Sequence, residues 1–89
     1  MMYPYITFSD ETIVTHSQIF DFEGRDSLEV NFEKPIEGGF KVARAKLPDY
    51  TWLKNEGYSE KEISFFTEFL HSNAHLLYRY AVAGGMKLA

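Results

Sequence analysis

The chain has 89 residues, a formal net charge of −4 and no cysteine. This length fits one domain with a modest core, and the lack of cysteine excludes disulfides, thiolate catalysis and thiolate metal sites. Hydrophobic residues make up 45% and charged residues 25%, which is the balance of a globular protein rather than a disordered one. The acidic balance, without a basic stripe, disfavours nucleic acid as a general partner.

The N-terminus gives no sign of a targeting segment. Residues 1–4 lack a charged region followed by an apolar one, and no apolar run reaches the roughly 18 residues of a membrane span. The sequence therefore predicts a cytoplasmic protein without a membrane partner. No motif in it indicates a cofactor.

The N-terminal half has the alternating pattern of an antiparallel sheet. Four strands are expected within about residues 2–47, at residues 3–8, 12–22, 27–33 and 40–47. The alternation of the second strand slips around His16, so a bulge or bend is expected there. Pro35 is expected to end the third strand, and Lys41 to pair with a glutamate of that strand.

The second half is expected to be helical. Asp49 is a candidate cap for a short helix over about residues 50–56, which Gly57 would end. A long helix over about residues 59–83 follows, and residues 86–89 form a loose tail. The predicted fold class is α+β, a single domain with a four-stranded antiparallel meander in the order β-β-β-β-α-α and the long C-terminal helix on one face.

Both ends of the long helix carry strong signals within residues 58–85. Ser59 followed three residues later by Glu62 makes a capping box, and Tyr58 and Ile63 are placed for a hydrophobic staple. Gly84 and its neighbour Gly85 suit a left-handed C-terminal position. No proline or glycine interrupts the segment between these signals.

Two apolar lines run along this helix. The first is the expected core stripe and consists of Ile63, Phe66, Leu70, Ala74, Leu77 and Ala81. The second lies beside it and consists of Phe65, Phe69, Leu76 and Tyr80. Because the combined arc is wider than one flat sheet face covers, either the sheet curls around the helix or the second line meets another protein. We expect a homodimer through this aromatic flank or through a sheet edge.

Three titratable residues lie on the polar side of the helix. Glu68, His71 and His75 stand at positions i, i+3 and i+7, where side chains share a face and imidazoles can bind one metal ion. His16 is the candidate for a third imidazole. Ser72 stands where a zinc protease has its catalytic glutamate, which removes the general base. The competing interpretation is a solvated polar face, so a small histidine-dependent or metal-dependent hydrolase is kept only as an alternative.

A basic group on the fourth strand supports another alternative. Lys41, Arg44 and Lys46, followed by Tyr50 and Trp52, resemble a weak patch for a phosphate or a single-stranded base. An accessory protein for nucleic acid or for a toxin–antitoxin pair would use Arg44 and its neighbours. The preferred hypothesis is a non-enzymatic binding or assembly module whose partner is itself or another protein.

Overall fold

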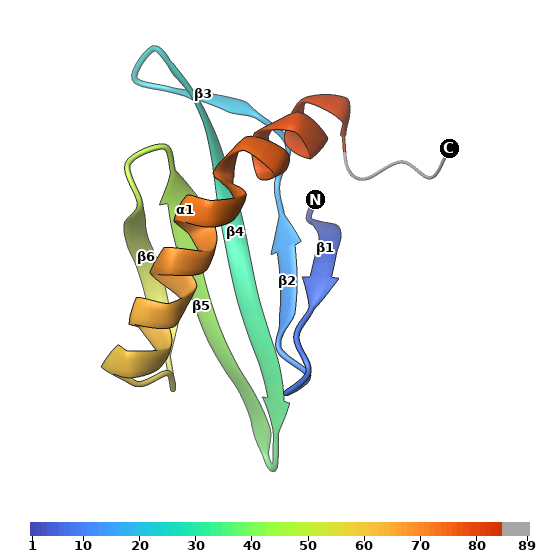
Figure 1. Cartoon of the computed structure of the whole chain (residues 1–89), viewed down its shortest axis with the longest axis vertical. Coiled ribbons are helices and arrows are strands. Elements are labelled where there is room, and N and C mark those ends of the chain that lie inside the picture. Colours follow the sequence, from blue (N-terminus) through green and yellow to red (C-terminus); the bar gives the residue numbers. More distant parts are fainter. Residues whose placement is uncertain (85–89) are drawn as a thin grey trace.

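The computed structural model describes residues 1–84. Within them lie six strands and one helix: β1 (Tyr3–Thr7), β2 (Ile13–His16), β3 (Phe20–Phe22), β4 (Arg25–Ile36), β5 (Gly39–Leu47), β6 (Thr51–Glu56) and α1 (Glu60–Ala83). Figure 1 shows α1 lying obliquely across one face of the sheet. Gly85 and the expected tail at residues 86–89 fall outside the described residues.

The strands form one antiparallel sheet in the order β1-β2-β4-β5-β6, and β3 pairs with β4 beyond the end of β2. The prediction of a four-stranded meander with two helices is therefore wrong, because the described residues form six strands and a single long helix. The α+β layering with one helix on one face remains.

Residues 50–56 are the main correction. Instead of a short helix, they contain strand β6, which pairs with β5 from Val42 to Lys46. An isolated helix of this length is marginal, whereas the free edge of β5 offers backbone groups that need partners. Trp52 adds to the preference for the strand, because its ring packs against the core and its Nε1 donates to Thr67 Oγ1 at 3.2 Å.

The expected long second strand is divided into β2 and β3, with the break where the alternation slips. Ser17 keeps the two halves attached to β4, because its N–H donates to the Glu29 carbonyl and its Oγ accepts from the Glu29 N–H, both at 2.9 Å. Residues 17–19 thus lie opposite residues 28–29, so one extra residue is accommodated.

The long hairpin of β4 and β5 also departs from expectation. Pro35 does not end the strand but pairs with Phe40. Since β2 and β3 pair with β4 only before this point, the missing N–H of Pro35 breaks no bond on that side. Lys41 lies directly opposite Lys34, and its Nζ reaches Glu62 of the helix at 3.5 Å instead of a strand glutamate.

The core lies between α1 and the facing side of the sheet. Phe66 stacks on Phe32 of the central strand β4, with ring centroids 4.3 Å apart and an interplanar angle of 10°. The predicted core stripe is confirmed: four of its members are buried, and Ile63 and Ala74 pack partly buried against the core. The buried apolar side chains are Val14, Leu28, Val30, Phe32, Ala43, Ala45, Leu47, Tyr58, Phe66, Leu70, Leu77 and Ala81.

Both predicted helix ends are present. Ser59 Oγ accepts from the Glu62 N–H at 3.1 Å, and the Glu62 carboxylate accepts from the Ser59 N–H at 2.9 Å. The backbone hydrogen bond from Ser59 is the main cause that lowers the pKa of Glu62. At the other end Gly84 has φ 79°, and its N–H donates to the carbonyls of Ala81 and Tyr80.

The capping box predicts a measurable stability loss. Ser59→Ala removes the acceptor for the Glu62 N–H, so the free energy of unfolding should fall by about 1 kcal/mol in urea titrations. Ser64→Ala is the matched control, because Ser64 lies exposed in the helix interior, where alanine is the better helix former. Equal losses in the two variants would contradict the capping role.

Leu70 tests the docking of the helix. Leu70 is fully buried, so Leu70→Ala should lower the free energy of unfolding by about 2 to 5 kcal/mol, through lost transfer energy and a residual cavity. Leu53→Ala, in a half-exposed position of β6, should change it by less than about 1 kcal/mol. Denaturant unfolding followed by circular dichroism distinguishes the two. A loss at Leu70 no greater than that at Leu53 would argue against this packing.

Candidate functional site

The structure covers part of the aromatic flank of α1 with the edge strand β1. The Tyr5 ring lies 6.1 Å from that of Phe69 and 5.9 Å from that of Tyr80, and its hydroxyl donates to Asn73 Oδ1 at 2.7 Å. Leu76 is partly buried. Phe65, in contrast, remains 55% exposed. Strand β1 therefore covers two members of the second apolar line, Phe69 and Tyr80, and leaves its N-terminal member open.

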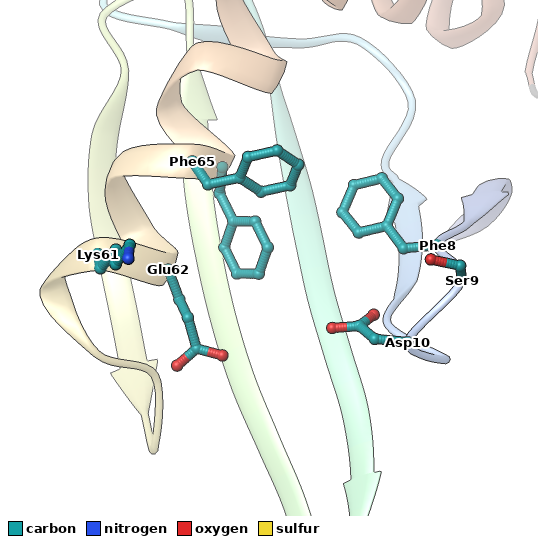
Figure 2. Close-up of a pocket in the computed structure, with 7 residues that line it drawn as sticks. Phe8, Ser9, Asp10, Lys61, Glu62 and Phe65 are labelled. Carbon is teal, nitrogen blue, oxygen red and sulfur yellow. The ribbon is translucent and has the colours of Figure 1, made fainter.

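An open groove lies beside Phe65, between the first turns of α1 and the turn that joins β1 to β2. Its volume is about 560 Å³. Figure 2 shows Phe65 on the helix side facing Phe8 on the turn side. Phe66 also lines the groove, and Ser9, Asp10, Lys61 and Glu62 complete its lining. The hollow thus has aromatic walls and a charged rim.

The β1–β2 turn holds Phe8 in place through short-range hydrogen bonds. The Phe8 N–H donates to the Thr12 carbonyl at 2.8 Å, the Glu11 N–H to the Phe8 carbonyl at 2.9 Å, and the Thr12 N–H to Asp10 Oδ1 at 3.0 Å. Phe8 packs on Phe69 with ring centroids 5.0 Å apart. The turn is therefore a defined structure, and the aromatic wall that it supports is preformed.

Each carboxylate of the rim lies near one lysine. Asp10 lies 3.4 Å from Lys34 Nζ, and Glu62 lies 3.5 Å from Lys41 Nζ. Lys61, the third lysine in this region, is exposed and forms no ion pair within 4.0 Å among residues 1–84. The rim thus carries one lysine that is available for a partner carboxylate.

A buried tyrosine lies behind the groove. Tyr58 is 7% exposed, and its ring packs edge-on against Phe66 with centroids 4.9 Å apart. Its hydroxyl and the hydroxyl of Thr12 are buried, and neither forms a hydrogen bond of good geometry within the described residues. Desolvation, together with the nearby carboxylates of Glu62 and Asp10, raises the pKa of Tyr58 to about 12. The packing around Phe66 therefore requires Tyr58 in its neutral form.

The predicted metal ligands occupy separate environments. Glu68, His71 and His75 are exposed on α1, and the His71 ring stacks on Tyr50 at a centroid distance of 3.8 Å. His16 is fully buried beside the rings of Tyr3 and Tyr5 of the neighbouring strand β1, and its Nδ1 lies 2.9 Å from the Ser17 carbonyl and must donate to it. Residues 1–84 contain no group of three His, Cys, Asp or Glu side chains arranged to hold a metal ion.

The basic residues of β5 are divided between the two sheet faces, and each has an acidic partner. Lys41 faces the helix and Glu62, whereas Arg44 Nη1 lies 3.5 Å from Glu29. Lys46 Nζ lies 3.2 Å from Asp49 and 3.4 Å from the centre of the Phe22 ring. These pairs reduce the positive potential that a phosphate would meet.

Sequence reasoning identified Phe65 but missed the opposite wall of the groove. The sequence places Phe8 at the end of the first expected strand, residues 3–8, and nothing in it singles out Asp10 or Lys61. The available signal was the polar turn Ser9-Asp10-Glu11 directly after an aromatic residue, since such a turn reverses the chain and turns Phe8 toward a neighbouring element.

Comparisons with protein-family models, curated proteins and solved structures gave no match to this chain. Among the described residues, no helix is both long and apolar enough to cross a membrane.

The raised pKa of Tyr58 predicts that the free energy of unfolding falls at alkaline pH. A phenol whose pKa rises from 10.0 in the unfolded chain to about 12 in the folded one stabilises the fold fully below pH 10, and this contribution is lost as the pH rises toward 12. Urea titrations between pH 9 and 12 should show a shallower decline for Tyr58→Phe than for the parent chain. Because Tyr5 and Tyr78 also have raised pKa values, some decline should remain. Identical declines would contradict this role of Tyr58.

Proposed function

We propose that this protein is a binding and assembly module whose contact surface is the aromatic groove lined by Phe8, Phe65 and Phe66. The observation that carries the proposal is the exposure of Phe65, a large ring on the rim of an open apolar hollow. Exposed aromatic rings next to a preformed hollow are typical of the buried centre of protein interfaces.

The outer strands β1 and β6 support the groove as the contact surface, because both carry features that oppose strand addition. On β1, Pro4 lacks an N–H, and the register shifts between Pro4 and Ile6. On β6, the register shifts opposite Arg44 and Ala45, and Lys54 and Glu56 place charges along the edge. Prolines, bulges and edge lysines are the usual protection against pairing with another chain.

The chemistry of the groove favours binding over catalysis. Its two carboxylates already pair with Lys34 and Lys41, so they are held as charged acceptors rather than poised for proton transfer. The aromatic walls provide apolar area at little conformational cost, since the packed rings of Phe8 and Phe66 are already fixed. A partner that presents an apolar side chain would therefore gain most of its affinity here.

Site-specific photocrosslinking in the cells that express the protein tests this proposal. Benzoylphenylalanine at position 65 should give discrete covalent adducts of the chain, because the groove brings a partner within reach of the ring. The matched control is the same replacement at Val82, which is 76% exposed at the other end of α1. Adducts at position 65 and not at position 82 would support the groove. No adduct at 65, or the same adducts at both positions, would overturn it.

A further inference from the structure

We propose that the partner in the groove is a second copy of this chain, docked about a two-fold axis that passes through the centre of the groove. This inference rests on the proposed function, and it adds both the identity of the partner and the symmetry of the contact. A two-fold interface requires one patch that is complementary to itself. The rim of the groove meets this requirement in shape and in charge.

The helix side and the turn side of the groove carry different residues, and a rotation of 180° exchanges the two sides. Figure 2 shows Lys61 and Phe65 on the helix side, and Phe8 and Asp10 on the side of the β1–β2 turn. A rotation of 180° about an axis through the middle places the helix side of one copy over the turn side of the other. The edge-on pair of Phe8 and Phe65, with ring centroids 5.9 Å apart in each copy, then faces the same pair of the partner, and each Lys61 faces the partner's Asp10.

The charges on the rim make this exchange attractive. Lys61 is exposed and has no ion-pair partner among residues 1–84, and the Asp10 side chain is 53% exposed. Asp10 keeps an accessible carboxylate surface even though Oδ1 accepts from Thr12 and Oδ2 lies near Lys34. Two identical Lys61–Asp10 pairs at the rim would favour this alignment of the two copies over other alignments.

The shape of the patch supports the same arrangement. Phe65 projects, and the hollow of about 560 Å³ beside it is large enough for an aromatic side chain from the partner. Rings at the centre with charges at the edge reproduce the usual division of an interface into an apolar core and a polar rim. The aromatic residues would thus provide the affinity and the charged residues the register.

Complementary charge reversals test the two-fold geometry. Lys61→Glu alone places a second carboxylate opposite Asp10 at both ends of the dimer, and Asp10→Lys alone places two ammonium groups opposite each other at both ends. Each variant alone should dimerise more weakly by about tenfold or more in sedimentation equilibrium, because like charges meet at both ends of the groove. An equimolar mixture should recover the parent affinity as a heterodimer, since both contacts then join opposite charges.

Two controls keep the test decisive. Arg79→Glu reverses an exposed charge on α1 away from the groove and should leave the dimer unchanged. Carbodiimide crosslinking of mixed ¹⁴N and ¹⁵N parent chain needs no Asp10 variant, so it remains informative if Asp10→Lys weakens the turn. It should yield a mixed-label crosslink between Lys61 and Asp10, which only contact between two copies produces.

The outcomes separate this inference from the proposal on which it rests. A parent chain that remains monomeric at millimolar concentration, or a mixture of the two reversals no tighter than each alone, would overturn the second copy as partner. If position 65 still formed adducts with a different protein, the groove would remain a binding surface. If neither a dimer nor any adduct formed, both proposals would fail.

Discussion

The architecture depends on the stacked pair of Phe66 and Phe32. The rings lie 4.3 Å apart and nearly parallel, and they attach the first half of α1 to the central strand of the sheet. Three further aromatic side chains, those of Phe8, Trp52 and Tyr58, pack around Phe66 from a turn, an edge strand and the segment before the helix. One contact therefore positions elements that are far apart in the sequence.

The groove follows from this attachment. Docking through Phe66 turns the neighbouring Phe65 toward the edge of the sheet that β1 forms. Tyr5 of β1 covers Phe69 and Tyr80, but the chain reverses after Phe8. Phe65 therefore meets the Phe8 ring edge-on, with centroids 5.9 Å apart, and remains 55% exposed. An aromatic content of 17% supplies more ring surface than a small core can bury.

Local signals predicted the helix well because its determinants are local. The capping box of Ser59 and Glu62 and the 3.6-residue period of the core stripe act within a few residues of each other. The strands were predicted less well, since residues 50–56 become a strand only by pairing with β5. Pro35 is tolerated within β4 because β2 and β3, which pair with one side of β4, end before it. The sequence predicted only the helix side of the groove, through Phe65. Phe8 on the other side could not be predicted, because it reaches the groove by a tertiary contact.

The central claim is that two copies of this chain meet through the aromatic groove, and amide chemical shifts measured along a dilution series test it most directly. As the concentration falls from millimolar to micromolar, we expect shift changes concentrated at residues 8–10 and 61–66, with the edge strand β6 and the hairpin tip around Phe40 unchanged. Changes centred on β6 or on Phe40 would contradict the claim, because these surfaces lie away from the groove.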